Sequence, residues 1–396
     1  MKLVLINSWY APFGKGGSER SVQAVAEALV QRGHQVSVIT SAVSSKPETE
    51  VLNGVDVYRL PNVNLYSIAT QPDVSIVKRI AWRVVDDVNI VSARRVNALI
   101  ERLDPDIVQT NCLYGFSPFV AAVRTNQRTK YIHTPRDYYL GCWRASMFRG
   151  NERCATPCRS CTILTASRRN GVAHSDAYLF ISDFSRSVHD MIFEAGRDRP
   201  QQVVYNPIAP PAIPASPRTG YLNEHLTLGF IGRLSPHKGA DLFVETVTAD
   251  TSLRGVVAGD GKPEFIAQLK AVADPDRIDF RGFVPPAELL ARVDALVVPS
   301  RWDEPFGRVV IEAMGHGVPV IGAQIGGIPE LIQPGVTGEL FDPAAAGSLD
   351  QAIASFRGRD IAAMSKNALA FAENFRPAKI AESYESFFIA VLEGTA

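Results

Sequence analysis

Two carboxylates flank a glycine in the segment Glu-Pro-Phe-Gly-Arg-Val-Val-Ile-Glu, which runs from Glu304 to Glu312. The spacing of the apolar residues that follow Gly307 predicts a helix over 309–315. The backbone N–H groups at such a helix start carry the positive end of the helix dipole and could seat a diphosphate. Glu304, in the preceding loop, could accept hydrogen bonds from sugar hydroxyls, and Glu312, one turn inside the helix, from those of a ribose. The plainer interpretation is that both acids only serve the helix dipole.

Two cations five residues apart occur in another loop, Gly-Arg-Leu-Ser-Pro-His-Lys-Gly, over 232–239. Arg233 and Lys238 could neutralise the charge that develops on a leaving diphosphate. The glycines at both ends of the loop indicate that backbone approaches closely here. A solvated loop with two surface cations is the alternative.

Two further loops that follow expected strands are rich in glycine. The first contains Gly14, Gly16 and Gly17 and precedes a helix that should begin near Ser18. This loop has neither the Gly-x-Gly-x-x-Gly dinucleotide pattern nor the Gly-Lys-Ser/Thr of phosphate-binding loops, so a flexible turn is the plainer interpretation. The second loop, Gly259-Asp260-Gly261, is permissive in the same way and is weak evidence by itself.

The composition bounds the class of protein. A chain of 396 residues exceeds what one core usually organises, so two domains of near-equal size are expected. Lysine plus arginine equals aspartate plus glutamate at 41 each, which gives no global charge for binding nucleic acid. The apolar run Leu3–Ile6 is too short for a signal peptide or a membrane span. We therefore expect a cytoplasmic protein without transmembrane segments.

Short β-rich runs alternate with helical stretches, as in a parallel sheet covered on both faces. The expected strands are 2–7, 35–40, 107–110, 130–133 and 178–182 in the first half, and 227–231, 255–258, 277–280, 295–299 and 319–322 in the second. The stretch Asn206–Arg218 contains five prolines and suits a linker, so a domain boundary is expected near Pro207. Two doubly wound domains would bind ligands in a cleft at the carboxyl ends of their strands.

The ordered set of motifs resembles the retaining, nucleotide-sugar-dependent glycosyltransferases numbered family 4, and the resemblance covers nearly the whole chain. Besides the segments above, it rests on Pro299-Ser300 and on Gly326-Gly327-Ile328-Pro329-Glu330 followed by Gly335 and Gly338. The resemblance implies an α/β fold of the GT-B type, with two Rossmann-like domains of doubly wound parallel sheet facing across a cleft. The expected parts are an acceptor-side domain over 1–206 with a Cys-rich insertion near 140–165, a donor domain over 207–377, and a C-terminal helix over 378–396 that crosses back to the first domain.

By this resemblance, the donor domain carries most of the site. Glu304 would contact the hydroxyls of the donor sugar, and Glu312 the ribose. Arg233 and Lys238 would hold the phosphates. The remaining donor-binding positions are Gly16, Gly17, Gly259, Gly261, Gly307, Arg308 and Val309, of which the last three would hold the diphosphate. The segment 281–283 resembles the part of the family that contacts the base.

His133 ends an expected strand in Tyr-Ile-His-Thr-Pro, where the family carries an active-site histidine that contacts the donor sugar from the first domain. From the residues alone, a histidine that satisfies neighbouring backbone groups is an equally good account. Arg136 and Asp137 follow in the same loop and could line the acceptor side.

The family implies transfer with retention of anomeric configuration, in which the leaving phosphate acts as base toward the acceptor hydroxyl. We expect a UDP- or GDP-sugar as the donor substrate and a carbohydrate or lipid-linked acceptor. Arg233, Lys238 and the helix start would supply positive charge, so no catalytic metal is expected. Two alternatives stay open: a nucleotide-sugar 2-epimerase of the same architecture, and a non-catalytic carbohydrate-binding or scaffold protein stapled by a metal.

Four of the five cysteines fall in one segment, and these are Cys142, Cys154, Cys158 and Cys161. In a cytoplasmic chain, clustered thiols more often bind metal than form disulfides, and four thiolates suit a structural zinc ion. Only the last two form a Cys-x-x-Cys pair, so an iron–sulfur cluster and unligated or oxidisable thiols stay open.

The stretch 76–103 is predicted to form one long helix that mixes basic residues such as Lys78 and Arg79 with apolar ones. Such a helix could rest on an anionic membrane surface if the acceptor is lipid-linked, which would give a peripheral membrane contact. Asp86 and Asp87 interrupt the basic face, so we prefer an amphipathic helix packed on its own domain. No heptad run predicts an oligomeric state.

Overall fold

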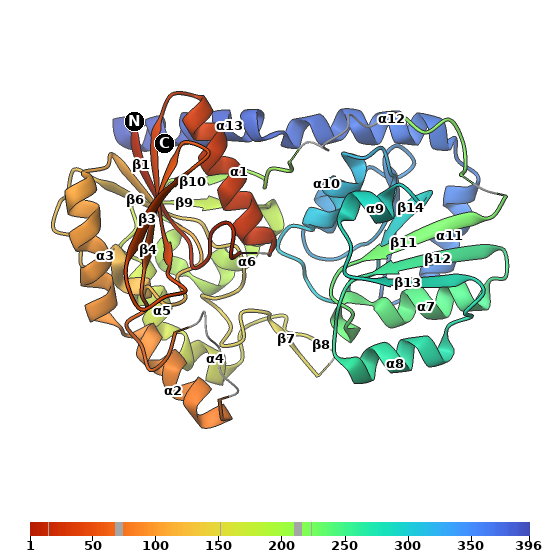
Figure 1. The fold of residues 1–396 in the computed structure, drawn as a ribbon, viewed down its shortest axis with the longest axis horizontal. Coiled ribbons are helices and arrows are strands. Elements are labelled where there is room, and N and C mark those ends of the chain that lie inside the picture. Colours follow the sequence, from red (N-terminus) through yellow and green to blue (C-terminus); the bar gives the residue numbers. More distant parts are fainter. Residues whose placement is uncertain (15, 68–73, 151, 210–215, 223) are drawn as a thin grey trace. The chain divides into compact units, whose positions relative to one another are not determined.

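The computed structural model describes residues 1–14, 16–67, 74–150, 152–209, 216–222 and 224–396. These residues form two compact units (Figure 1). Unit 1 comprises Met1–Met147, Ala155–Pro207 and Pro377–Ala396, and unit 2 comprises Phe148–Cys154 and Ile208–Arg376. The C-terminal helix therefore groups with unit 1, and a short piece of the Cys-rich insertion groups with unit 2. Three prolines of the expected linker, Pro210, Pro211 and Pro214, lie outside the described residues.

Unit 1 is built on an eight-stranded sheet in the order β10-β9-β6-β5-β1-β2-β4-β3, parallel except for the edge pair β3–β4. Its strands are β1 (Lys2–Ile6), β2 (Gln35–Ser41), β3 (Glu48–Leu52), β4 (Val55–Leu60), β5 (Ile107–Thr110), β6 (Lys130–His133), β9 (Ala177–Phe180) and β10 (Gln201–Val203). Its helices are α1 (Gly17–Gln31), α2 (Ile76–Asp87), α3 (Ile90–Leu103), α4 (Arg159–Leu164), α5 (Ala166–Val172), α6 (Asp183–Ile192) and α13 (Pro377–Glu393).

Helices cover both faces of this sheet, and β1 shows why. Leu3 and Leu5 belong to the core that contains residues of α1 and α13. Val4 and Ile6 belong to a second core, which contains residues of α3. Successive strand residues point to opposite faces, so a strand buried on both sides must be apolar at every position. This is the covered parallel sheet that the apolar runs predict.

Unit 2 contains a six-stranded parallel sheet in the order β13-β12-β11-β14-β15-β16. Its strands are β11 (Leu226–Ile231), β12 (Leu253–Ala258), β13 (Ile278–Gly282), β14 (Ala295–Val298), β15 (Val320–Ala323) and β16 (Gly338–Phe341). Its helices are α7 (Ala240–Ala249), α8 (Pro263–Val272), α9 (Pro286–Leu290), α10 (Arg308–Met314), α11 (Ser348–Arg357) and α12 (Ile361–Ala372). An antiparallel hairpin of β7 (Phe148–Arg149) and β8 (Glu152–Arg153) groups with this unit.

The two parallel sheets confirm the predicted fold class of two Rossmann-like units. The prediction of a single helix over 76–103 is wrong, because α2 ends at Asp87 and α3 begins at Ile90. Asn89 explains the break: its side chain accepts a hydrogen bond from the backbone N–H of Ser92 at 2.9 Å and so caps a new helix.

Candidate functional site

Four loops of unit 2 leave the carboxyl edge of its sheet. They follow β11, β12, β14 and β15, and they span 232–239, 259–261, 299–307 and 324–327. Because these strands are parallel, the loops after them emerge on the same side of the sheet. This edge therefore collects most of the predicted site residues.

Glycines let these loops touch backbone to backbone. Gly239 has φ +72°, and a Cβ on it would lie 1.8 Å from the carbonyl oxygen of Pro299. A Cβ on Gly259, which has φ +143°, would lie 1.7 Å from the carbonyl oxygen of Gly232. A side chain at either position would clash with backbone, so both positions require glycine.

Glu304 is buried among these loops, with 8% of the residue exposed. Its Oε1 accepts a hydrogen bond from Lys238 Nζ at 2.9 Å and another from Ser300 Oγ. Gly326 makes room for this loop, since a Cβ there would lie 2.5 Å from the backbone nitrogen of Glu304. Within the described residues, no hydrogen bond reaches Glu304 Oε2. One oxygen is thus held in place while the other can accept from a ligand.

Aromatic rings lie beside the ammonium group of Lys238. Nζ is 4.8 Å from the centroid of the Trp302 ring, within cation–π range. The His237 ring packs edge-on against the same indole, with the ring centroids 6.2 Å apart. Burial and the nearby charges of Lys238 and Arg233 lower the pKa of His237, which keeps its imidazole neutral at neutral pH. Neither His237 nor Trp302 is among the predicted site residues. Trp302 lies two residues before Glu304, but its contact with Lys238 of another loop leaves no local signal in the sequence.

Glu312 is also held by a cation. α10 begins at Arg308, one residue earlier than predicted, directly after Gly307 at φ +91°. Arg308 Nε donates to Glu312 Oε1 at 2.7 Å, and the two side chains are only 15% and 18% exposed. No second hydrogen bond to this carboxylate occurs in the described part of the chain. Glu312 therefore repeats the arrangement of Glu304. Val309 follows Arg308 in the first turn of the helix.

The cation Arg233 is exposed and forms no ion pair among the residues that the structure describes. The backbone N–H of the next residue, Leu234, donates to the carbonyl oxygen of Asp260 at 2.8 Å, which joins this loop to Gly259–Gly261. Gly259 N–H in turn donates to the carbonyl oxygen of Gly282 at 2.7 Å. The segment predicted to contact a base therefore adjoins these loops, and it presents Phe283 with 74% of the residue exposed.

In unit 1, the predicted residues lie at the carboxyl edge of the other sheet. Gly16 and Gly17 stand at the start of α1, after β1, and His133 ends β6. His133 is only 2% exposed, and its Nδ1 lies 2.8 Å from Thr110 Oγ1. Burial lowers the pKa of His133 to about 3, so its imidazole is neutral. Its predicted contact with a donor sugar stays a prediction.

Arg136 joins several parts of unit 1. Its guanidinium donates to Asn111 Oδ1 at 2.8 Å, to Asn206 Oδ1 at 2.6 Å and to Tyr384 Oη at 3.3 Å. These hydrogen bonds give the buried guanidinium a structural role in unit 1. Asp137 beside it is different, because burial raises the pKa of its carboxyl to about 6. A carboxyl with such a pKa can exchange a proton near neutral pH.

Three of the clustered cysteines, Cys142, Cys158 and Cys161, belong to unit 1, whereas Cys154 belongs to unit 2. Burial raises the pKa of the Cys161 thiol to about 11, and the Cys158 and Cys142 thiols act in the same direction. In the described part of the chain, no group of three or more His, Cys, Asp or Glu side chains is arranged to hold a metal ion. The structural zinc site therefore stays a prediction.

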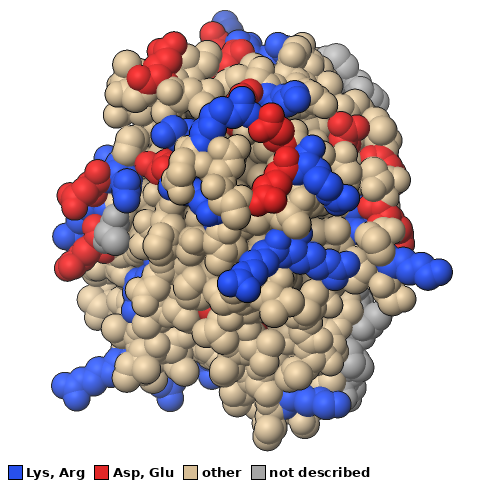
Figure 2. All heavy atoms as spheres, turned by 90° about the vertical axis from the view of Figure 1, so that its left-hand side faces the viewer, with Lys and Arg blue, Asp and Glu red and all other residues tan. Residues whose placement is uncertain are grey.

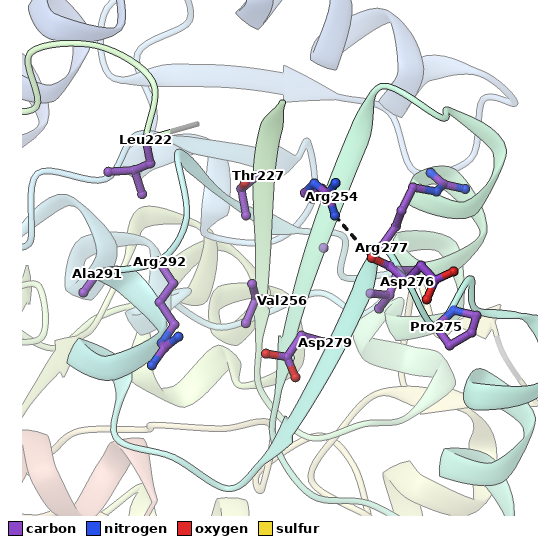
Figure 3. A pocket seen from close by; sticks show the side chains of 12 residues that line it. Leu222, Thr227, Arg254, Val256, Pro275, Asp276, Arg277, Asp279, Ala291 and Arg292 are labelled. Carbon is purple, nitrogen blue, oxygen red and sulfur yellow. Dashed lines mark hydrogen bonds between the residues drawn. The ribbon is translucent and has the colours of Figure 1, made fainter. Parts of the chain in front are cut away.

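A pocket of unit 2 lies at the opposite edge of the sheet from these loops (Figure 3). Thr227, Arg254 and Ile278 line it, and they stand near the amino ends of β11, β12 and β13. Arg254 donates to the carbonyl oxygen of Asp276 at 3.2 Å beside the pocket. None of the predicted site residues lines this pocket.

Two family models match the chain. The model described as "Glycosyl transferase 4-like domain" matches residues 16–207, and the model described as "Glycosyl transferases group 1" matches residues 225–357. A curated protein of Klebsiella pneumoniae, described as "Uncharacterized 42.6 kDa protein in cps region", is 31% identical over 333 residues. That match covers 84% of this chain and 87% of the Klebsiella protein.

Solved structures share the fold at low sequence identity. Sucrose-phosphate synthase from Thermosynechococcus elongatus has a TM-score of 0.77 at 18% identity and is matched over 99% of both chains. Anabaena HepE in complex with UDP and glucose has a TM-score of 0.67 at 19% identity, over 98% of this chain and 100% of HepE. Identities this low establish a common fold and leave function to be argued from the site.

Proposed function

Because this chain belongs to the group 1 glycosyltransferase family, we propose that it transfers a sugar from a UDP- or GDP-sugar to a carbohydrate or lipid-linked acceptor with retention of the anomeric configuration. One observation carries the proposal: Glu304 and Glu312 each have one oxygen fixed by a cation and, among the described residues, one oxygen without a hydrogen bond. Such carboxylates suit vicinal hydroxyls of a sugar and a ribose. The related fold of HepE, solved with UDP and glucose, supports a nucleotide-sugar donor.

In the proposed reaction, the bond between the anomeric carbon and the diphosphate oxygen breaks, and a bond from that carbon to the acceptor oxygen forms on the same face. The proton of the acceptor hydroxyl passes to the leaving diphosphate, so atoms and charges balance. Lys238 and Arg233 counter the charge that grows on the diphosphate. These two cations supply the role that a divalent metal would otherwise have, so the proposal requires no catalytic metal.

In this proposal, Lys238 has two roles. Its ammonium touches Glu304, which would hold the sugar, and it lies in the loop that would face the diphosphate. Contact with both groups would couple recognition of the sugar to neutralisation of the leaving group. The cation–π contact with Trp302 restricts the ammonium to this position.

Calorimetric titration of the full chain with UDP, GDP, ADP and their sugar conjugates tests the donor half of the proposal. We expect one nucleotide series to bind saturably, and Glu312→Gln to weaken it by about 10- to 100-fold, as for loss of a charge-assisted hydrogen bond. Glu339→Gln is the matched control, because Glu339 also pairs with an arginine, Arg359, at 2.9 Å in unit 2. Absence of binding by every nucleotide would favour the carbohydrate-binding or scaffold alternative.

Product analysis separates the two enzymatic alternatives. Retention predicts that the anomeric proton of the product shows the same configuration by NMR as that of the donor sugar. A free epimerised sugar released without any acceptor would instead indicate a nucleotide-sugar 2-epimerase. We place the reaction in the cytoplasm, at the inner face of the membrane when the acceptor is lipid-linked.

A structural zinc ion on the clustered cysteines is a separate proposal. Elemental analysis of the purified chain should find about one zinc ion per chain, and Cys158→Ser should lower that value. Cys112→Ser is the control, because Cys112 lies outside the cluster and bonds to Ser18 Oγ at 3.3 Å. Full zinc content in Cys158→Ser, or none in the wild type, would contradict the site.

A further inference from the structure

Helix α2 exposes apolar side chains along one face. Ile76, Val77, Ile80 and Val84 are 62%, 71%, 47% and 49% exposed. At 3.6 residues per turn, these four positions fall within an arc of about 100°. We call these four residues the α2 stripe. An amphipathic helix that packs on its own domain would bury such a stripe, so the stripe requires another explanation.

The opposite face of α2 holds the helix to unit 1. Trp82 is 5% exposed, and its Nε1 donates to the carbonyl oxygen of Tyr66 at 2.8 Å. Asp86 is 1% exposed and accepts from the backbone N–H of Gly115 at 3.0 Å. The acids that seemed from the sequence to interrupt a basic face therefore point into the unit. α2 therefore packs on its own unit, as the sequence predicts, but through these residues and not through its apolar stripe.

The second acid of α2 is buried in the same way. Asp87 is 4% exposed and accepts from Arg168 Nε at 2.8 Å. Lys78 and Arg79 are the exposed charged side chains of this helix, all of whose residues the structure describes. No acidic residue of the described stretch 74–98 is exposed.

The surface beyond α2 has the same character. Further exposed side chains of this region are Val85, Val88, Val91, Arg94 and Arg95. Figure 2 views this side of the molecule: acidic side chains gather in the upper part of the face, and the lower part shows almost only uncharged and basic residues. In Figure 1, α2 lies at that lower end.

We propose that the α2 stripe docks into the surface of an anionic lipid bilayer. Apolar side chains accompanied only by basic ones match the boundary between acyl chains and anionic headgroups. A second copy of this surface fits less well, because the described stretch 74–98 exposes no acid that could pair with its basic side chains. Among the described helices, none is long and apolar enough to cross a bilayer, so α2 would lie in the interface. The inference does not depend on the proposed transfer reaction.

Vesicle co-sedimentation of the full chain tests this proposal. We expect binding to vesicles that contain phosphatidylglycerol, little binding to pure phosphatidylcholine vesicles, and weaker binding at high salt. Ile80→Asp should reduce binding by at least about tenfold, because it places a carboxylate in the apolar boundary. The double variant Lys78→Glu/Arg79→Glu should have a similar effect on anionic vesicles only.

Val51→Asp is the matched control. Val51 is 65% exposed on the edge strand β3 of the same unit, so this variant adds the same charge at an exposed apolar position outside α2. Its binding should equal that of the wild type, and circular dichroism should show unchanged folding of every variant. Absence of sedimentation with anionic vesicles at low salt would overturn the proposal. So would equal loss of binding in Val51→Asp, or a dimer in light scattering that Ile80→Asp dissociates.

Discussion

The carboxyl edges of the two sheets use polar side chains in opposite ways. At the edge of unit 2, Glu304 and Glu312 each keep a free oxygen, and Arg233 is exposed without an ion-pair partner in the described chain. At the edge of unit 1, Arg136 donates hydrogen bonds to three partners. His133 is buried there, with its Nδ1 2.8 Å from Thr110 Oγ1. Position at a sheet edge therefore does not identify a site. Among the described residues, carboxylate oxygens without a hydrogen-bond partner are what distinguishes the unit 2 edge as a candidate site.

The largest expected effect is a loss of activity when a charged residue at the unit 2 edge is removed. Lys238→Ala removes the counter-charge of Glu304 and a cation from the proposed diphosphate site. We expect kcat/KM for sugar transfer to fall by about 10²- to 10³-fold, as for loss of one preorganised electrostatic group. Lys270→Ala in α8 is the control and should leave the rate unchanged. A rate in Lys238→Ala within about threefold of the wild type would remove Lys238 from the mechanism.

At the unit 1 edge, we expect a substitution to lower the stability of the fold. Arg136→Leu leaves the side-chain oxygens of Asn111 and Asn206 without their donor. We expect the free energy of unfolding in urea to fall by about 3 kcal/mol, and by less in Lys238→Ala, because the Lys238 ammonium is partly exposed and makes fewer hydrogen bonds than Arg136. Equal losses of unfolding free energy in the two variants would mean that Lys238 contributes to the stability of its unit as much as Arg136 does, and would contradict the comparison.

The pH dependence of stability sharpens the same contrast. The pKa of His133 is about 3 in the folded chain and near 6.5 when the side chain is unperturbed, so the unfolded chain binds a proton that the folded chain rejects. The stability from neutral His133 is present above pH 6.5 and is lost as the pH falls toward 3. The advantage of the wild type over His133→Asn should shrink by up to about 1.4 kcal/mol per pH unit between about pH 6 and pH 4.

Urea unfolding at several pH values measures this effect. The wild type and the variant must be compared because other buried groups also change the stability with pH. Buried His189 makes the folded chain more stable as the pH rises, as His133 does. Buried Asp86, whose pKa is raised to about 7, makes it less stable as the pH rises. His225→Asn changes an exposed histidine and should keep the slope of the wild type. A constant difference between His133→Asn and the wild type at all pH values would mean that His133 is not the titrating group.

The smallest expected effect concerns the hairpin that groups with unit 2. Arg153 NH1 lies 3.2 Å from Asp303 Oδ1, next to Glu304, but Arg153 is 52% exposed. A pair this exposed contributes at most about 1 kcal/mol, so Arg153→Ala should raise the donor KM by about two- to fivefold with kcat unchanged. Exchanging the charges with Arg153→Asp/Asp303→Arg should restore part of the loss. A fall in kcat would show that the hairpin acts on the chemistry instead.

Much of the fold could be predicted because its signals are local. The strands β5 and β6 match their expected ranges residue for residue, since each contains β-branched or aromatic residues that favour strands. The strands β3, β4, β7, β8, β10 and β16 are absent from the expected set. β10 has only three residues, and β3 is mostly exposed at the sheet edge, so neither shows an apolar run.

The placement of the candidate site residues could be predicted in part for the same reason. Glu304, Glu312, Arg233 and Lys238 stand in motifs with fixed spacing, and the structure gathers the loops that carry them at one sheet edge. The partners Ser300 and Trp302 could not be assigned, because their contacts with Glu304 and Lys238 depend on how loops from different strands pack.

The sequence by itself determined that two parallel sheets form and that charged, glycine-rich loops follow their strands, because periodicity and motif spacing are properties of neighbouring residues. Only the tertiary structure decided which partner each charge takes. Lys238 reaches Glu304 across 66 positions, and Asp86 and Asp87 turn inward instead of lining a basic face. The direction of a side chain follows from packing against elements that are distant along the chain, and local spacing carries no information about those elements.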